Sequence, residues 1–232
     1  MDLDDKTRLI QKWAGAPVDG DYGNITADAI INKAGIKPSS VNSVSKYVNK
    51  PTPKILLELL EHEAIVCEAY KDSVGVWTWG VGVTGKSGHT IARYKDNPVS
   101  IERCLEVYEW LVRERYLPAV LKAFEGCPLT EEQLGGALSF HYNTGAILIA
   151  DWVKSFKAGN RNKAYTEFLN WSSPREIIGR RKAERALFFN GVWTSDGKVT
   201  VYTKVHKPSY SPDWGSAKQV DIRPALESVM KG

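Results

Sequence analysis

The segment that most constrains the fold joins an apolar stretch to a glycine-rich one. Residues 53–70 read PKILLELLEHEAIVCEAY, and their apolar side chains recur with the period of an amphipathic helix. The following residues, KDSVGVWTWGVG, place Gly75, Gly80 and Gly82 between apolar residues, which is typical of the tight turns of a β-hairpin. The sequence therefore predicts a helix from about Pro53 to Tyr70 that leads directly into a hairpin.

One residue of this predicted helix, Glu63, does not fit an ordinary surface role. At about 100° per residue it falls near the middle of the apolar arc, which is formed by Ile55, Leu56, Leu59, Leu60, Val66 and Cys67. The opposite, solvated face holds Lys54, Glu58, Glu61 and Glu68, with Leu57 and Ile65 as apolar exceptions. Burial raises the pKa of a carboxyl group, so Glu63 is a candidate general acid. A structural ion pair with a buried arginine explains this residue alone equally well.

Composition and charge favour a globular protein over a membrane protein or a nucleic-acid-binding protein. The chain has 232 residues, of which 43% are hydrophobic and 25% charged, as expected of a soluble globular protein with one sizeable domain and a small module. Its longest apolar runs are too short and too charged to cross a bilayer, and the polar start MDLDDKTRLI predicts neither a signal peptide nor a membrane anchor. A net charge of +4 without a dense basic patch argues against a nucleic-acid partner.

The cysteines give no sign of a bound metal ion. Cys67, Cys104 and Cys127 lack the spacing of metal ligands. We expect them to be free thiols in a protein that is made in a reducing cytoplasm, and we expect neither a metal nor a cofactor.

Changes in composition divide the chain into four segments. Residues 1–37 contain two short helical patterns, residues 38–53 are rich in Ser, Asn and Pro and resemble a linker, and residues 54–193 are mostly helical. Residues 194–232 form a C-terminal extension, in which Val199–Val205 and Lys218–Ile222 alternate like two short strands of a hairpin.

Capping signals mark the helices of the third segment. Ser100 caps a helix to about Arg115, and Pro118 starts a second piece to Phe124. Two capping boxes are expected, at Thr130–Gln133 for a helix through His141 and at Ser173–Glu176 for a helix that closes on Gly191. Further helices are predicted over NTGAILIADWVKSF and NKAYTEFLNW.

The spacing of Glu63, Asp72 and Thr78, E-x8-D-x5-T, resembles the catalytic motif of the phage-type lysozymes, or endolysins, of glycoside hydrolase family 24. Downstream, PLTEEQLGGALSFHYNTG is similar to the second signature of that family, and Trp171 with GRRKAERALFFNG to the third. The resemblance covers about residues 53–193. One departure is Val83, where the family often has a histidine that we expect to support the hairpin.

The resemblance implies an α+β, mostly helical fold with two lobes, a small β-hairpin lobe and a helical lobe. It implies that Glu63 donates a proton to the leaving oxygen, that Asp72 holds and deprotonates a water, and that Thr78 orients the same water. It also implies that Arg180 pairs with Glu63, although Arg181 fits that role too. We expect the sugar cleft to be lined by His141, Tyr142 and Asn143, with Tyr70 and Trp77 as stacking surfaces or as core aromatics.

The first segment resembles a shortened peptidoglycan-binding repeat. In LIQKWAGAPVDGDYGNITADAI, the matching residues are Gln11, Asp19, Gly20, Tyr22, Gly23, Thr26 and Ala29. The alternative is a helical cap that packs on the catalytic lobe. As a wall-binding module it would add avidity rather than strong affinity of its own.

Together these features predict a monomeric muramidase that cleaves the β-1,4 bond between N-acetylmuramic acid and N-acetylglucosamine in peptidoglycan, with inversion. The resemblance implies an endolysin that waits in the host cytoplasm until a holin permeabilises the membrane, and then acts in the periplasm and cell wall. The alternatives are a lytic transglycosylase, which needs no second carboxylate, and a wall-binding protein without activity.

Overall fold

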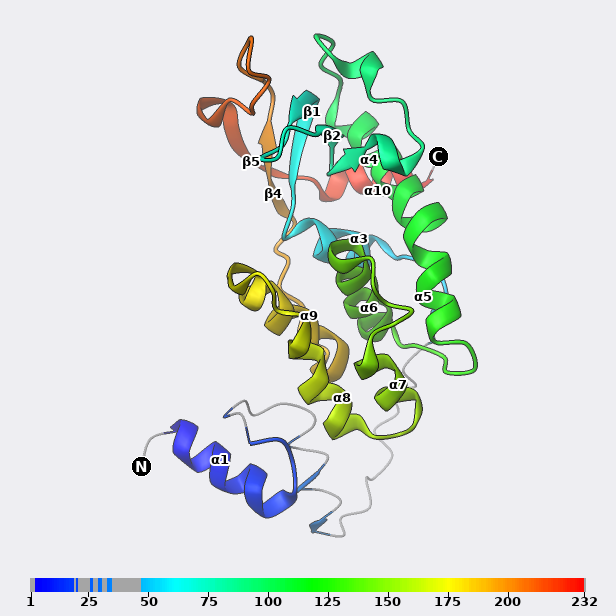
Figure 1. Ribbon diagram of the computed structural model, residues 1–232, viewed down its shortest axis with the longest axis vertical. Helices are drawn as coiled ribbons and strands as arrows, with labels where there is room; N and C mark the ends of the chain where they lie inside the picture. Colours follow the sequence, from blue (N-terminus) through cyan, green and yellow to red (C-terminus); the bar gives the residue numbers. More distant parts are fainter. Residues whose placement is uncertain are drawn as a thin grey trace. The chain divides into compact units, whose positions relative to one another are not determined.

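The computed structural model describes residues 3–18, 20, 26, 29–30, 33–34 and 47–231. The fold is α+β, as predicted (Figure 1). The chain forms two compact units, Met1–Asn49 with Ala119–Trp193 and Lys50–Pro118 with Thr194–Gly232. Each unit is built from two separate stretches of chain, so the units do not follow the linear order of the four segments suggested by the sequence.

The second unit contains a five-stranded sheet in the order β3-β2-β1-β4-β5. Its strands are β1 (Ala64–Lys71), β2 (Trp77–Gly80), β3 (Val83–Thr84), β4 (Lys198–Tyr202) and β5 (Ala217–Asp221). β1 pairs with β2, β2 with β3, and β4 with β5 in antiparallel fashion, whereas β1 and β4 run parallel. The C-terminal hairpin expected from the sequence is confirmed, and Figure 1 shows it lying beside β1, so the extension continues the sheet of the glycine-rich hairpin.

Helices cover this sheet and complete the core of the unit. They are α3 (Pro53–Leu60), α4 (Ile101–Leu111), a π-helical segment (Val112–Tyr116) and α10 (Arg223–Lys231), with 3-10 turns at Gly85–Ser87, Ala92–Tyr94 and Trp214–Ser216. Ser100 caps α4 as predicted, because its side chain accepts a hydrogen bond from the Arg103 amide. The sequence reading missed α10, which packs on α3 and α4 and buries Leu226 completely.

The predicted helix from Pro53 to Tyr70 is wrong in its second half. The helix ends at Leu60, the chain turns, and β1 begins at Ala64. β1 is an inner strand with neighbours on both edges and is buried over most of its length. A strand buried on both faces lacks polar alternation, so its apolar run is not distinguishable from a buried helix by periodicity alone.

The exposure of several residues in this segment also differs from the prediction. Glu58 and Glu68, predicted to be solvated, are 3% and 7% exposed. Ile65, predicted as an apolar exception on the surface, is fully buried. Glu63 lies outside the helix, in the connection to β1, and is half-buried.

The first unit is helical in its described residues. It contains α1 (Leu3–Ala14), most of α5 (Leu117–Ala123), α6 (Glu131–Thr144), α7 (Asp151–Lys157), α8 (Arg161–Phe168) and α9 (Ile178–Asn190), with 3-10 turns at Leu169–Trp171 and Arg175–Ile177. α6 and α9 approach closely at Gly136, where an added Cβ would lie 2.8 Å from Phe188 Cβ. The core between the helices is aromatic and includes Phe140, Trp152, Phe168, Phe188 and Phe189.

The predicted capping boxes differ in outcome. The box at Thr130 is confirmed: Thr130 Oγ1 accepts from Gln133 N (3.3 Å), and Gln133 Oε1 accepts from Thr130 N (3.0 Å). The box at Ser173 is wrong, because the 3-10 turn Arg175–Ile177 stands where the first helical turn was expected and α9 begins only at Ile178. The C-terminal cap was placed correctly, since Gly191 ends α9 with a left-handed backbone (φ 70°).

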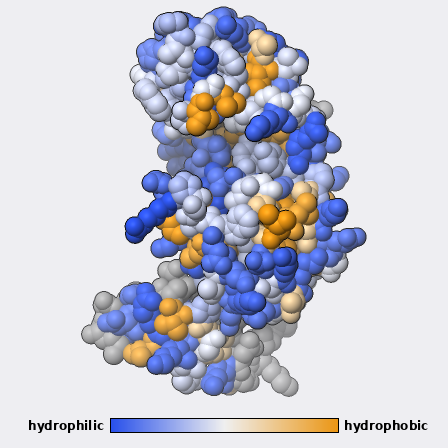
Figure 2. Space-filling model, viewed as in Figure 1, coloured by the Kyte–Doolittle hydropathy of each residue, from blue (hydrophilic) through white to orange (hydrophobic). Residues whose placement is uncertain are grey.

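The surface in Figure 2 is largely hydrophilic, with small separate apolar patches. Within the described ranges, no helix combines the length and the apolar character needed to span a bilayer.

Candidate functional site

Glu63 occupies the connection between α3 and β1. Thr52 caps the start of α3 through a hydrogen bond from Ile55 N (3.2 Å), and Pro53 fits the first helical position. At the other end, Glu63 N donates to Leu60 O (3.0 Å), which closes the turn immediately before the strand. Glu63 is thereby held by a helix end on one side and the sheet on the other, and its side chain lines a pocket of about 330 Å³.

Asp72 organises the turn between β1 and β2. Its Oδ1 accepts hydrogen bonds from Val74 N (3.0 Å) and Val76 N (2.8 Å), and its own amide donates to Val76 O (3.0 Å). Within the described part of the chain, no hydrogen bond involves the second carboxylate oxygen, Oδ2. Asp72 can therefore shape the turn and still act in catalysis, since one oxygen holds the hairpin and the other is available to a substrate or a water.

Thr78 follows in β2 and is 3% exposed. Its hydroxyl donates to Val76 O (3.1 Å), so the oxygen lone pairs remain as acceptors. Thr78 is the direct cross-strand partner of Tyr70, and directly opposed residues place their side chains on the same face of a sheet.

The predicted catalytic carboxylates act electrostatically on two tyrosines. The pKa of Tyr70 is raised to about 12, first by burial and then by the negative charges of Glu63 and Asp72. The pKa of Tyr116 is raised by burial and by Glu63. For both tyrosines burial is the larger cause, and the carboxylate charges add to it.

Trp77, the other predicted stacking residue, is half-buried at the start of β2. Its ring meets Tyr210 of the C-terminal extension edge to face, with the centroids 4.9 Å apart. Lys71 and Lys95 each place their ammonium group 5.5 Å from the Trp77 ring. The aromatic surface of the hairpin is therefore partly occupied by the protein's own side chains.

The remaining predicted cleft residues belong to the helical unit. His141, near the end of α6, is buried, and burial lowers the pKa of its imidazole. Tyr142 is half-buried, and Asn143 is exposed and accepts a hydrogen bond from Arg181 Nη2 (2.5 Å). These three residues follow one another along the last turn of a single helix.

Two arginines of α9 surround one buried glutamate. Glu184, 2% exposed, pairs with Arg180 Nε (3.0 Å) and with Arg181 Nη1, and it accepts from Ser139 Oγ (2.8 Å). Arg181 is fully buried and also donates to Trp171 O (3.1 Å). Glu63 belongs to the other unit, so its predicted ion pair with Arg180 or Arg181 stays a prediction.

The N-terminal segment is described only in part. Gln11 and Thr26 are 1% and 2% exposed and are joined by a hydrogen bond from Gln11 Nε2 to Thr26 Oγ1 (3.1 Å). Gln11 Oε1 also accepts from Gly20 N (3.0 Å). These contacts hold the segment together, whereas Asp19 and Tyr22, also predicted for wall binding, lie outside the described residues.

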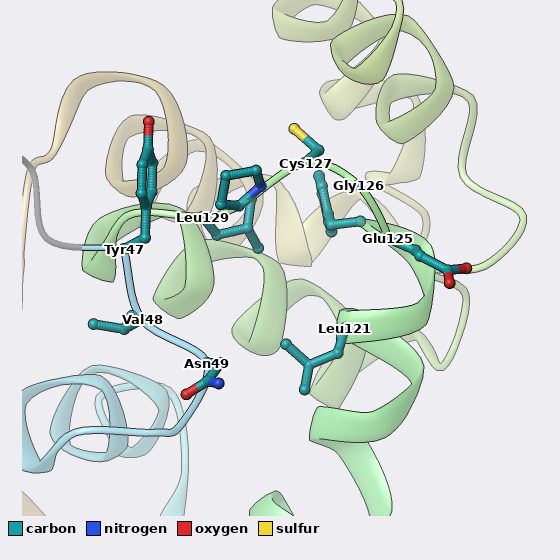
Figure 3. Close-up of a pocket in the computed structure, with 10 residues that line it drawn as sticks. Tyr47, Val48, Asn49, Leu121, Glu125, Gly126, Cys127 and Leu129 are labelled. Carbon is teal, nitrogen blue, oxygen red and sulfur yellow. The ribbon is translucent and has the colours of Figure 1, made fainter.

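A larger pocket, of about 540 Å³, lies in the helical unit (Figure 3). It is lined by Tyr47, Val48 and Asn49, by Leu121 and Phe124 of α5 and its end, and by the loop 125–129. Glu125 is the sole ionisable carboxylate among these lining residues, and none of the predicted catalytic residues is among them. Across the described residues, no cluster of three His, Cys, Asp or Glu side chains is placed to hold a metal ion.

Several residues near Glu63 were missed by the sequence reading. Tyr116 ends a π-helical segment in which Leu117 N bonds Val112 O, and π-helical turns often occur at functional sites. The pocket beside Glu63 is also lined by five residues of the C-terminal extension: Asp196, Lys198, Val199, Thr200 and Gln219. Pro118 cannot donate a backbone hydrogen bond, so it indicates an irregular helix near this position. It does not indicate that Tyr116 lies near Glu63.

Comparisons of this chain with known proteins agree on one family. Residues 60–184 match the phage lysozyme family. The endolysin of Salmonella phage P22 is 30% identical over 148 residues, which cover 58% of this chain and 94% of that protein. A crystal structure of a P22 lysozyme mutant aligns with a TM-score of 0.52 and 25% identity, over 61% of this chain and 99% of the other. The endolysin from Escherichia coli O157:H7 phage FAHEc1 aligns with a TM-score of 0.56 and 23% identity, over 63% and 97%, and shares the fold.

Proposed function

Since the chain belongs to the phage lysozyme family, we propose that it hydrolyses the β-1,4 bond between N-acetylmuramic acid and N-acetylglucosamine in peptidoglycan. The observation that carries this proposal is the geometry of the hairpin that follows Glu63. Asp72 Oδ1 accepts from Val74 N and Val76 N, and Thr78 is the direct partner of Tyr70 across the hairpin. Glu63 lies in the connection immediately before the first strand of the same sheet and lines the pocket there.

Each of the three groups has a role in glycoside hydrolysis. Glu63 donates its proton to the oxygen of the leaving sugar. Asp72 uses Oδ2 to accept a hydrogen bond from a water and removes a proton from it as the water attacks the anomeric carbon. The Thr78 hydroxyl, which donates to Val76 O, accepts a hydrogen bond from the same water and fixes its orientation.

This division of roles corresponds to inversion of the anomeric carbon. An inverting enzyme separates its two carboxyl groups by roughly 6.5–9.5 Å to admit a water, against about 5–5.5 Å in a retaining enzyme. The hairpin supports the water-based mechanism, because Asp72 Oδ1 is already held by Val74 N and Val76 N. A carboxylate fixed in this way is suited to position a water and not to move onto a sugar.

The residues of the helical unit complete the proposed cleft. His141, Tyr142 and Asn143 bind the glycan, and Arg180 or Arg181 balances the charge of Glu63 from α9. Within the helical unit, Glu184 pairs with both guanidinium groups and accepts from Ser139 Oγ, which fixes the arginine side chains in α9.

Several biological features follow from the same proposal. The enzyme acts as a monomeric endolysin that is released from the host cytoplasm by a holin and reaches the cell wall through the periplasm. The N-terminal segment adds affinity for the wall through Gln11, Asp19, Tyr22 and Thr26, by direct contact or by shaping the segment that makes contact.

Mass spectrometry of peptidoglycan digests tests the reaction. Hydrolysis leaves reducing muramic acid ends, whereas a lytic transglycosylase leaves 1,6-anhydro ends. The Glu63→Gln variant is the control, since glutamine preserves the side-chain volume but cannot donate the proton. We expect reducing ends from the wild type and a loss of at least about 100-fold in Glu63→Gln, the lower range for general acid catalysis. Anhydro ends, or no cleavage by the wild type, would contradict the proposed reaction.

A further inference from the structure

The pocket that contains Glu63 has a second wall that the family match does not include. Residues 60–184 match the family, whereas Asp196, Lys198, Thr200 and Gln219 lie beyond it in the C-terminal extension. We propose that this pocket is a sugar-binding subsite, in which the extension holds an uncharged N-acetylated hexose next to the glycosidic bond that Glu63 protonates. The inference rests on the proposed function of Glu63 and assigns a role to residues 194–232.

The sheet register places the extension's polar side chains together. Lys198 and Thr200 are two residues apart in β4, so they point to the same face. Gln219 of β5 is the direct partner of Thr200, and its Nε2 donates to Thr200 Oγ1 (2.8 Å). Thr200 in turn is paired with Ala64 of β1, the residue that follows Glu63. The three side chains therefore form one polar surface that begins beside the candidate acid.

Hydrogen bonds to Glu58 anchor the first residues of the extension, next to the pocket. The carboxylate of Glu58 in α3 accepts hydrogen bonds from Thr194 N (3.0 Å), Thr194 Oγ1 (2.7 Å) and Ser195 N (3.0 Å). Glu58 is 3% exposed, so loss of these bonds would leave a buried charge without partners. A wall held in this way keeps its geometry relative to α3 and Glu63, as a binding subsite requires.

The polar groups of the pocket suit the hydroxyl and amide groups of a sugar. Glu61 and Asp196 offer carboxylate acceptors, Lys198 offers donors, and the amide of Gln219 and the hydroxyl of Thr200 offer both. At about 330 Å³ the pocket is at the small end of the range for small-molecule sites, roughly 300–1,000 Å³. One ring, and not an extended chain, fits that size.

The charges of the pocket favour an uncharged ring. The pKa of Glu61 is raised by desolvation and then by the negative charges of Asp196 and Glu58. This acidic lining disfavours phosphorylated or carboxylated rings and suits N-acetylglucosamine, which stays uncharged when the stem peptides are removed from the glycan. Lys198 in the same wall repels an ammonium group, which argues against the diamino acid of a peptidoglycan stem peptide.

Matched lysine variants on opposite faces of the hairpin test the proposal. Lys198→Ala removes a charge from the pocket, while Lys218→Ala removes an equal charge from an exposed residue whose partner in β4 is Val201, on the other face. Gln219→Leu adds a second pocket variant of similar volume. Unfolding curves of all three full-length variants check the fold, and we expect it to be kept because each mutated side chain is exposed.

Binding is measured by calorimetry in the full-length Glu63→Gln background, with glycan chains from which an amidase has removed the stem peptides. We expect Lys198→Ala and Gln219→Leu each to weaken binding by about tenfold, the scale of one lost hydrogen bond to a ligand, and Lys218→Ala to leave it unchanged. Equal effects of Lys198→Ala and Lys218→Ala would overturn the proposal. It would also fail if the pocket variants affected only glycans that still carry stem peptides. Because this readout needs no cleavage, a failure of the subsite is distinguished from a failure of the proposed hydrolysis.

Discussion

The two regions that flank the family match differ in what they contact. The C-terminal extension continues the sheet of β1 and hydrogen-bonds to Glu58 through Thr194 N, Thr194 Oγ1 and Ser195 N. It also contacts the hairpin of β1 and β2 through Tyr210, whose carbonyl accepts from Lys71 N (2.8 Å). The N-terminal segment belongs to the helical unit, where Asn162 Nδ2 donates to Gly15 O (3.1 Å). One region is built into the unit that holds Glu63, and the other is attached to a different unit.

This difference teaches that position outside a family match does not decide whether a segment is accessory. Both regions lie outside the family match, but the extension shares hydrogen bonds, ion pairs and a pocket with the rest of the unit that holds Glu63. Lys207 of the extension contacts Glu68 Oε1 at 2.6 Å and also pairs with Asp96, on two separate elements of that unit. We therefore expect loss of the extension to affect folding and chemistry, and loss of the N-terminal segment to affect binding.

Removal of residues 194–232 has the largest expected effect. It exposes the edge of β1, uncovers the surface of α3 and α4 that packs against α10, and leaves the Glu58 carboxylate buried without its partners. We expect the shortened protein to be insoluble or to lack a cooperative unfolding transition, and to have no measurable lytic activity. A soluble truncated protein with wild-type activity and a normal thermal transition would show that the extension is not needed for folding or activity.

A single substitution tests the anchoring of the extension. Glu58→Ala leaves Thr194 N and Ser195 N without acceptors, and we expect the free energy of unfolding to fall by about 1–3 kcal/mol, as for other buried hydrogen-bonding groups. Denaturant titration measures it. Glu227→Ala, on the exposed side of α10, is the matched control and should change stability by less than about 0.5 kcal/mol. Comparable losses in both variants would remove Glu58 from the anchoring role.

Removal of the N-terminal segment is expected to have a smaller effect, and only on binding. A protein that starts at Tyr47 retains the bridge of Tyr47 to Thr130 and the hydrogen bond from Val48 N to Leu129 O (3.0 Å). We expect cleavage of soluble glycan fragments to be unchanged and retention on intact sacculi to fall by a few-fold, because the segment adds avidity. Pull-down of sacculi with both proteins measures this. Equal retention would favour a structural cap over a wall-binding module.

The smallest expected effect concerns acid stability of the extension. Arg223 lowers the pKa of Asp221 to about 2, and the pair is exposed at the junction of β5 and α10. Because the folded pKa is below the ordinary value near 3.8, this pair stabilises the fold above about pH 4 and loses its contribution as the pH falls toward 2. Asp221→Asn should therefore lower the thermal midpoint slightly at pH 6 and not at pH 2. An equal shift at both pH values would show that charge is not the cause.

The hairpin that carries Asp72 and Thr78 was predictable from the sequence, whereas its surroundings were not. Asp72 and Thr78 are fixed by a local hairpin, and hairpin turns have strong short-range signals in glycine spacing. The helix through Glu63 was predicted too long because β1 acquires neighbours on both edges, one of them from residues more than a hundred positions later in the chain. No local sequence pattern predicts such a parallel pairing, because the two strands are far apart in the sequence. For the same reason, the pocket wall formed by Lys198, Thr200 and Gln219 could not be predicted.

Burial of the acidic residues shows the same limit. Glu58 and Glu68 looked like members of a solvated face, but each is buried against a partner in the extension, Thr194 and Lys207 respectively. A helical wheel assigns exposure from spacing alone and cannot include partners that arrive from the far end of the chain.

The stereochemistry of the first product tests the central claim most directly. If Glu63 donates the proton and a water held by Asp72 and Thr78 attacks from the opposite side, the newly formed reducing end has the α configuration, and no covalent glycosyl-enzyme forms. Proton NMR of the anomeric signals in the first minutes of digestion, before mutarotation, distinguishes the two products. The account predicts the α-anomer first. An initial β-anomer would contradict it, because Asp72 or another carboxylate would then have attacked the sugar itself.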